Sequence, residues 1–393
     1  MSSDTLFSSS LVDTADHHRD LRASVSKLVG KFGRKYFQQV VAADEQPVEL
    51  WKALGDAGFL GVHVSEAYGG GGGGLAELNI CIEETAAQGC PILSMVISAI
   101  TAPIIAACGS EEMKREWLPG IATGTRKMCF AITEPNAGSN THKVSTHAVR
   151  KGNGWVINGA KYWTSDIDQS EAVMVVARDG APAADGARAG LSLFVVPTDT
   201  PGISKTRIDA ALKTTEKQFS VFFDNVEVSG EALIGEPGTG LKQVFSGLNP
   251  ERIAAAAINN GISRFAISKA AQYAKDRSVW KSPIGAHQGV AHPLAECYIN
   301  VQAARLLNAR AAQLCDGGED AAETANMAKF AAAEASLKAL DQAIQIHGGN
   351  GLSNEYGLAD LWFIARLHKT APVSREMILN FVSTHSLGLP KSY

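Results

Sequence analysis

Two short segments contain side chains whose types and spacing could support chemistry. Residues 130–140 read FAITEPNAGSN, where small residues and hydroxyls follow an apolar run. Small residues let backbone amides approach a planar ring or a pyrophosphate, and hydroxyls such as those of Thr133 and Ser139 supply neutral hydrogen bonds there. Residues 248–257 read LNPERIAAAA and place the carboxylate of Glu251 before an alanine-rich run.

Each of these segments also has a purely structural interpretation. The EPNAGSN stretch, taken alone, is a loop after a strand, and most such loops are turns. Asn249-Pro250-Glu251 also reads as a helix start, with an N-cap, a proline at the first helical position and a first-turn acid that the helix dipole favours. The residue types alone leave both interpretations open.

The cysteines and the N-terminal residues bound the chemistry further. The six cysteines form no CxxC pair, and no histidine lies at zinc-ligand spacing from any of them, so we expect no metal site and no disulfide framework. The first twenty residues contain several aspartates and no continuous apolar stretch, unlike a secretory signal or a transit peptide. The expected compartment is the reducing cytoplasm.

Composition excludes several classes of protein. The chain of 393 residues has 36 basic and 40 acidic side chains, a net charge of −4, and we therefore expect no nucleic-acid binding. With 45% hydrophobic and 19% charged residues it is typical of folded proteins. Residues 91–109 carry no charge and approach the length of a membrane span, but their prolines, serines and threonine favour a buried helical region. We expect no membrane association.

The elements that must position these residues follow from hydrophobic periodicity. Apolar residues recur at helical spacing from residue 11 to about 124, interrupted by a run of six glycines at 69–74 that predicts a loop. Short runs rich in β-branched and aromatic residues then predict strands from 128 to about 235, and long alanine-rich helices follow from 240. This order predicts an α+β protein with a β domain between two helical ones.

Three segments together resemble the acyl-CoA dehydrogenase family over nearly the whole chain. FAITEPNAGSN is close to the family form FAxTEPxAGSD, and GAKYWTS at 159–165 and AIQIHGGNG at 343–351 are similar to two further family segments. The resemblance implies an N-terminal helical domain at 1–126, a middle β domain at 127–238 and a C-terminal four-helix-bundle-type domain at 239–393.

The resemblance also implies FAD as the cofactor. In the middle domain, the matching FAD contacts are Phe130, Ala131, Ile132, Thr133, Gly138, Ser139, Trp163, Thr164 and Ser165. Without the family, Trp163 would be interpreted as a core residue, whereas the family packs this position against the flavin ring. Ser139 also matches a position close to the pantetheine of CoA.

The C-terminal half matches the part of the FAD site that a neighbouring subunit supplies. Arg277 stands where the family has an arginine that reaches the FAD pyrophosphate of that neighbour, although a lone helical arginine is more commonly a solvated surface residue. Further matching contacts are Gln288, Gln345, Gly348 and Gly349. A homo-oligomer is implied, a tetramer or a dimer.

The catalytic base is expected at Glu251. Most family members carry their carboxylate in a YEGTSE-like segment, which here reads TAPVSR at 370–375, with Ala371 in the glutamate's place. A branch that includes the isovaleryl-CoA and long-chain enzymes uses a segment of the form LDxER instead, which LNPER resembles. By resemblance Asn249 and Arg252 lie near CoA, and the Ala371 N–H binds the thioester oxygen. Burial would raise the pKa of Glu251, whereas Arg252 or a helix N-terminus would lower it.

The implied activity is dehydrogenation of an acyl-CoA to the trans-2-enoyl-CoA, with electrons passed to an electron-transfer flavoprotein. Two alternatives stay open at this point: an oxygen-using flavin enzyme of the same fold, either an acyl-CoA oxidase or a two-component monooxygenase, and a non-catalytic flavoprotein. The family pattern is altered at Trp280-Lys281, His287, Trp362-Phe363 and Val373, which leaves the contacts of the adenosine end of FAD unassigned.

Overall fold

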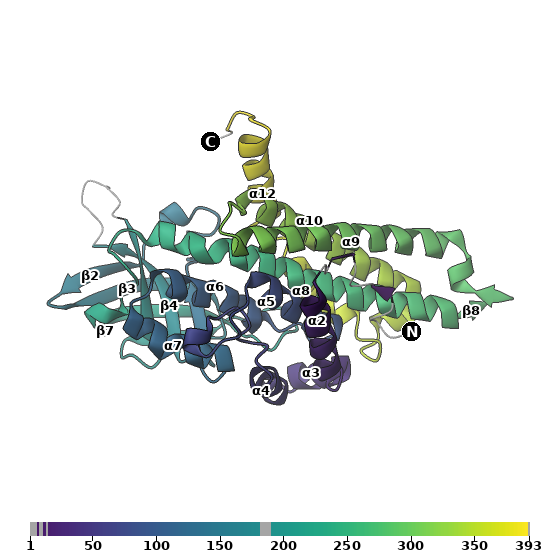
Figure 1. Ribbon diagram of the computed structural model, residues 1–393, viewed down its shortest axis with the longest axis horizontal. Coiled ribbons are helices and arrows are strands. Elements are labelled where there is room, and N and C mark those ends of the chain that lie inside the picture. The colour runs from purple at the N-terminus through teal and green to yellow at the C-terminus, as the bar shows by residue number, and fades with distance from the viewer. Residues whose placement is uncertain (1–5, 8–10, 13–14, 181–189, 392–393) are drawn as a thin grey trace.

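The computed structural model describes residues 6–7, 11–12, 15–180 and 190–391 (Figure 1). Helices occupy the first third of the chain, as the periodicity predicts. They are α2 (Asp16–Val29), α3 (Gly33–Ala42), α4 (Val48–Asp56), α5 (Leu75–Ala87), α6 (Leu93–Cys108) and α7 (Glu111–Thr123). The glycine run lies in the loop before α5, where the amides of Gly71 and Gly73 donate to the carbonyls of Gly61 and Val62.

The middle of the chain forms one seven-stranded sheet. Its strands are β1 (Met128–Ala131), β2 (His147–Lys151), β3 (Gly154–Ser165), β4 (Ala172–Asp179), β5 (Leu191–Pro197), β6 (Ile203–Arg207) and β7 (Gln218–Val228). The strand order is β1-β4-β2-β3-β7-β6, with β5 paired to β4. β1 and β2 each run parallel to β4, whereas the β2–β3, β3–β7, β6–β7 and β4–β5 pairs are antiparallel.

Three long helices follow and run side by side along the longest axis of the molecule (Figure 1). They are α8 (Gly240–Asp276), α9 (Gln288–Asp316) and α10 (Ala322–His347), and the short strands β8 (Ser278–Val279) and β9 (Ser282–Pro283) connect the first two. Alanines on one face of α10 bring its backbone close to its neighbours, because a methyl group is small and alanine favours the helix. The buried alanines on this face are Ala325, Ala328, Ala332, Ala335, Ala339 and Ala343.

A buried group of charges joins the N-terminal helices to the C-terminal ones. Arg22 of α2 and Arg264 of α8 contact the carboxylates of both Glu83 and Glu84 in α5, and Arg305 of α9 contacts that of Glu83. Burial alone would raise the pKa of Glu83, but the three guanidinium groups outweigh it and hold that pKa at about 2. The two helical regions consequently share one core.

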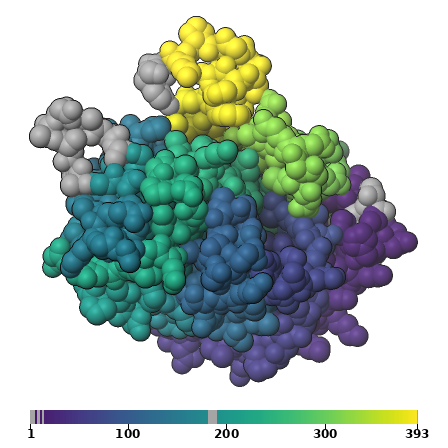
Figure 2. Space-filling view, turned by 60° about the vertical axis from the view of Figure 1, so that its left-hand side comes forward, coloured from purple at the N-terminus to yellow at the C-terminus, as the bar shows by residue number. Residues whose placement is uncertain are grey.

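The uncharged segment at 91–109 forms α6, whose apolar side chains are mostly buried between the sheet and α8. Among the described residues, no helix is long and apolar enough to cross a membrane. The chain ends in α11 (Trp362–Leu367), α12 (Arg375–Phe381) and the π-helical turn η8 (Val382–Ser386). This last segment stands out from the body of the molecule (Figure 2). The α+β fold class, with helical regions on either side of a β domain, is confirmed, while the domain boundaries remain a prediction.

Candidate active site

A buried ion pair joins the first two family segments. The Glu134 carboxylate lies 2.8 Å from the Lys161 ammonium, which also donates to the Ile132 carbonyl at 3.1 Å. Burial lowers the pKa of Lys161 to about 8 even though Glu134 raises it. The Tyr162 N–H donates to the Thr133 carbonyl at 2.8 Å. These contacts hold the end of β1 against the end of β3.

The same contacts turn Trp163 outward. The register between β3 and β7 shifts by one residue between Lys161 and Thr164, a bulge that places Trp163 at φ 58°. Bulges re-aim side chains and are frequent beside active sites. Trp163 is 45% exposed, so it is not the core residue that its type alone suggests.

The surroundings of Trp163 fit a flat, polar-edged group such as the flavin of FAD. The hydroxyl of Thr164 is buried with no hydrogen-bond partner among the described residues, whereas Ser165 donates to Gln218. Gly138 and Ser139 lie exposed in the loop after β1, and a methyl group built on Gly138 would meet nothing within 4 Å. A buried hydroxyl without a partner needs one, and a bound cofactor is one way to supply it.

Glu251 lies in the interior of α8 rather than at a helix start. The helix begins at Gly240, so the interpretation of Asn249-Pro250-Glu251 as a helix N-terminus is wrong. Burial raises the pKa of the Glu251 carboxyl to about 7, against the lowering charges of Arg252 and Lys329. The sequence left the direction of this pKa shift open, and in the structure the effect of burial exceeds that of the two cations. A carboxyl group with this pKa can accept a proton near neutral pH.

The part of α8 just before Glu251 also meets the segment that is predicted to bind FAD. Phe130, Ile132 and Leu248 pack against the same apolar cluster, which contains residues of α6, β1 and β4. The Ser94 hydroxyl at the N-terminal end of α6 donates to Asp166 directly after β3, at 2.8 Å. The end of β1, the end of β3 and the Glu251 region of α8 therefore surround α6.

Lys329 of α10 connects Glu251 to the segment 370–375. The side chain is only 1% exposed, and its ammonium donates to the Val373 carbonyl at 2.5 Å. Burial lowers the pKa of Lys329 to about 8; the charge of Arg252 lowers it as well, whereas Glu251 raises it. Lys329 thus places a positive charge beside the candidate base and fixes the segment that carries Ala371.

Two further contacts bear on the predicted substrate residues. Arg252 donates to the Asn249 side-chain carbonyl at 2.6 Å, so this pair is preorganised as a unit. The Ala371 N–H donates to the Leu367 carbonyl at 2.9 Å. That amide is therefore engaged within the chain and is not free to bind a thioester oxygen in this arrangement.

The remaining predicted FAD residues gather at the far end of α8. Arg277 follows that helix directly, and its carbonyl accepts from Ile284 in the turn before α9, whose first residue is Gln288. The AIQIHGGNG segment ends at the same place: Tyr273 stacks on His347 with ring centroids 4.2 Å apart and accepts a hydrogen bond from Asn350 at 3.1 Å.

These residues are exposed and open to a partner molecule. Arg277, Gln288, Gln345, Gly348 and Gly349 are all exposed, and methyl groups built on Gly348 and Gly349 would meet nothing within 4 Å. Gly348 has φ 59° and ψ −137°, a conformation that side chains disfavour. In Figure 1 the sheet lies at one end of the molecule and β8 at the other. The structure thus forms two separate groups from the predicted FAD contacts.

Sequence reasoning missed Glu134, Lys161 and Lys329 as positioning residues. Glu134 and Lys161 lie inside the two recognised segments, so their opposite charges were a usable signal. Lys329 stands in an alanine-rich helix 78 positions after Glu251, and nothing in its local pattern indicates burial beside a carboxylate.

Comparison with known proteins agrees with this geometry. Models of the N-terminal, middle and C-terminal domains of acyl-CoA dehydrogenases match residues 15–125, 129–226 and 238–386. The chain is 51% identical over 382 residues to the acyl-CoA dehydrogenase FadE12 of Mycobacterium tuberculosis, which covers 96% of this chain and 98% of that one.

Solved structures give the same answer. A glutaryl-coenzyme A dehydrogenase in complex with glutaryl-CoA is similar with a TM-score of 0.90 and 30% identity, covering 96% of this chain and 97% of that one. Butyryl-CoA dehydrogenase from Megasphaera elsdenii is similar with a TM-score of 0.89 and 26% identity, covering 95% and 99%. The three matched domains and the relative at 51% identity lead to one conclusion, with which the Glu251 carboxyl group and the outward tryptophan agree: the chain belongs to the acyl-CoA dehydrogenase family.

Proposed function

We propose that this protein catalyses the FAD-dependent α,β-dehydrogenation of an acyl-CoA thioester to the trans-2-enoyl-CoA. The observation that carries the proposal is the Glu251 carboxyl group, whose pKa desolvation raises to about 7, in a helix packed against the apolar α6. FAD, when bound, supplies the electron acceptor that takes the β-hydrogen as hydride. An electron-transfer flavoprotein is the proposed acceptor of those electrons, and the proposed assembly is a homotetramer.

In this proposal the residues of the chain divide the work between proton transfer and positioning. Glu251 takes the α-proton, and its low-dielectric surroundings make the carboxylate a stronger base than an exposed one. Arg252 and Asn249 bind the CoA portion. Trp163 and Thr164 orient the cofactor, while the Glu134–Lys161 pair holds their strand in place.

The test is replacement of Glu251 by glutamine, which preserves size and hydrogen bonding but removes basicity. FAD should remain bound, while flavin reduction by acyl-CoA should slow by roughly 10²- to 10⁴-fold, the scale of general base catalysis. Anaerobic stopped-flow measurement of flavin bleaching reports that rate. Adding Ala371→Glu to this variant should restore part of it, since Lys329 connects both regions.

The matched control is Glu376→Gln. This exposed carboxylate lies in the first turn of α12, next to the segment 370–375, and should leave the rate near that of the wild type. Wild-type reduction in Glu251→Gln would show that Glu251 is not the base. Failure of the rescue alone would count only against the predicted geometry at Ala371.

We further propose that the acyl group is apolar, either a medium, long or branched chain. α6 reads LSMVISAITAPIIAAC and offers no Arg or Lys to pair with a distal carboxylate. Within this mostly buried helix, the consecutive residues Val96, Ile97 and Ser98 are partly exposed, which makes them the candidate wall of the acyl pocket. Saturated fatty or branched acyl-CoAs should bleach the flavin faster than glutaryl-CoA. Efficient reduction by glutaryl-CoA with none by the others would contradict this substrate class.

A further inference from the structure

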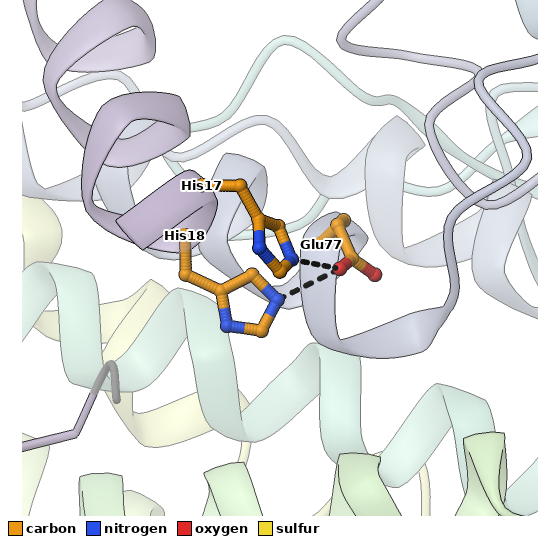
Figure 3. Close-up of side chains that lie close together, drawn as sticks. All are labelled: His17, His18 and Glu77. Atoms are coloured by element: carbon orange, nitrogen blue, oxygen red, sulfur yellow. Dashed lines mark hydrogen bonds and ion pairs between the residues drawn. The ribbon is translucent and has the colours of Figure 1, made fainter. Parts of the chain in front are cut away.

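Two histidines of α2 and a glutamate of α5 converge at one point on the surface. Figure 3 shows the imidazoles of His17 and His18 turned toward the carboxylate of Glu77. The Nε2 atoms of His17 and His18 lie 3.4 Å and 2.7 Å from the same carboxylate oxygen, Oε1. Neighbouring residues on a helix normally point in directions about 100° apart, so convergence of both rings on one atom is unusual.

The distances suit a small transition-metal ion. Tetrahedral zinc, with bonds of about 2.0–2.1 Å, places its ligand atoms about 3.3 Å apart. The three ligand atoms here lie within 4.8 Å of one another, and the His18–Glu77 pair lies at 2.7 Å, so each distance would have to change by no more than about 1.5 Å to reach that value. Two neutral imidazoles and one carboxylate form a ligand set that prefers zinc and related divalent ions over Mg²⁺ and Ca²⁺, which favour oxygen.

The framework that carries the ligands is held in place by other contacts. The second oxygen of Glu77, Oε2, accepts from the Gly74 N–H at 2.7 Å, which fixes the carboxylate at the start of α5. Asp316 of α9 accepts from Leu75 at 2.7 Å in the same turn. Arg22 of α2 contacts Glu83 of α5 at 3.2 Å farther along the same pair of helices. The two helices are thus locked at this spacing without any ion.

Exposure leaves room for a ligand from solvent. The side chain of His17 is 69% exposed, while those of His18 and Glu77 are about 20% exposed. Three protein ligands with one open side match the pattern of zinc sites in which water completes the tetrahedron. An ordinary ion pair between one histidine and Glu77 would not need the second imidazole.

We propose that His17, His18 and Glu77 form a binding site for a divalent transition-metal ion of the zinc type. The ion joins α2 to α5 and stabilises the packing of the N-terminal helix on the rest of the protein. The site contains none of the residues proposed for catalysis. It was not expected from the sequence, because Glu77 lies 59 positions after His18.

The test uses the FAD-loaded protein after dialysis against a chelator. Zn²⁺ titration by calorimetry should give one ion per chain, and Zn²⁺ should raise the thermal midpoint as a ligand of the folded state does. His17→Ala and His18→Ala should each weaken binding by at least the roughly 10- to 100-fold that changes near a metal site cost. Mg²⁺ should give no heat of binding at this site and no rise in midpoint.

His385→Ala is the matched control, since this exposed histidine of η8 belongs to no such cluster among the described residues. It should bind Zn²⁺ as the wild type does. Circular dichroism establishes that each variant is folded. A third variant, Glu77→Gln, should also weaken Zn²⁺ binding, but it changes the group that caps α5. If it unfolds for that reason, the two histidine variants still decide the question. Wild-type affinity in both His17→Ala and His18→Ala, or absence of Zn²⁺ binding at micromolar concentrations in the wild type, would overturn the proposal.

Discussion

The protonation of Glu251 depends on a balance between burial and two neighbouring cations. Burial raises its pKa to about 7, and the charges of Arg252 and Lys329 oppose that rise. Proton abstraction requires the carboxylate form, so we expect the rate of flavin reduction to fall as the pH drops through about 7. A pH profile of the reductive half-reaction measures this limb directly.

Lys329→Met tests the contribution of the buried ammonium group. Loss of its positive charge removes a contribution that lowers the pKa of Glu251, so the acidic limb should move to higher pH. At pH 7 the rate should fall by roughly 2- to 10-fold, since each pKa unit changes the deprotonated fraction up to tenfold. Lys329→Arg, which keeps the charge, should leave the limb closer to its wild-type position.

Lys338→Met provides the control on the same helix. Lys338 is exposed on α10 and pairs with Glu296 of α9, so its removal should not shift the acidic limb of the pH profile. An unchanged profile in Lys329→Met would show that the buried charge does not act on Glu251.

The sequence proposes Glu251 as the candidate base, but it does not reveal the electrostatic setting of this residue. LNPER and the alanine at position 371 are local patterns, and the family resemblance assigns them directly. The direction of the pKa shift depends on packing among α6, α8 and α10, and on Lys329 from a helix far along the chain. Burial by helices that are distant in the sequence cannot be recognised from a local sequence pattern, although it shifts the pKa.

At the scale of elements, α5 and α8 cross so closely that a glycine is required at the contact. A methyl group built on Gly261 of α8 would lie 2.5 Å from the Ala86 Cβ and would also strike the Glu83 carbonyl in α5. Gly261→Ala should therefore lower the free energy of unfolding by about 1 to 3 kcal/mol, the typical cost of overpacking. Urea unfolding followed by circular dichroism measures the change.

Gly289→Ala is the matched control for this crossing. Gly289 also lies in a helix, α9, but a methyl group there meets nothing within 4 Å. Its replacement should leave the stability unchanged or raise it by up to about 1 kcal/mol, because alanine favours the helix over glycine. Equal stability of the two variants would mean that α5 and α8 do not meet at Gly261 as described.

The order of helices and strands was predictable from periodicity, whereas two local features were not. The local pattern of Asn249 and Pro250 also allowed a helix start there, and only the structure shows that the helix runs on unbroken from Gly240. The bulge at Trp163 arises from the register between β3 and β7, which alternation along one strand cannot reveal. At both places packing overrides local preference.

At the scale of the molecule, the length of α8 separates the two groups of predicted FAD residues. Glu251 lies within this helix and Arg277 directly follows it. The 26 positions between them correspond to about 39 Å at 1.5 Å per residue. Arg277 therefore lies too far along the helix to contact a cofactor that is bound beside Glu251 of the same chain. The exposed Arg277 group and the exposed Trp163 suit a cofactor site shared between two copies of the chain.

Complementation between two inactive variants tests this sharing. Trp163→Glu should weaken FAD binding through the strand end of its own chain, and Arg277→Glu through the site of the neighbouring chain. Each variant alone should lose FAD at low free cofactor. In a hybrid of the two, one site combines Trp163 of one chain with Arg277 of the other and is intact, so co-expression should restore part of the bound flavin and the activity.

The control is Lys242→Glu, an exposed change at the opposite end of α8, which should retain FAD by itself. If the cofactor contacts all came from one chain, no hybrid would hold an intact site, and the co-expressed pair would stay as colourless as either variant alone.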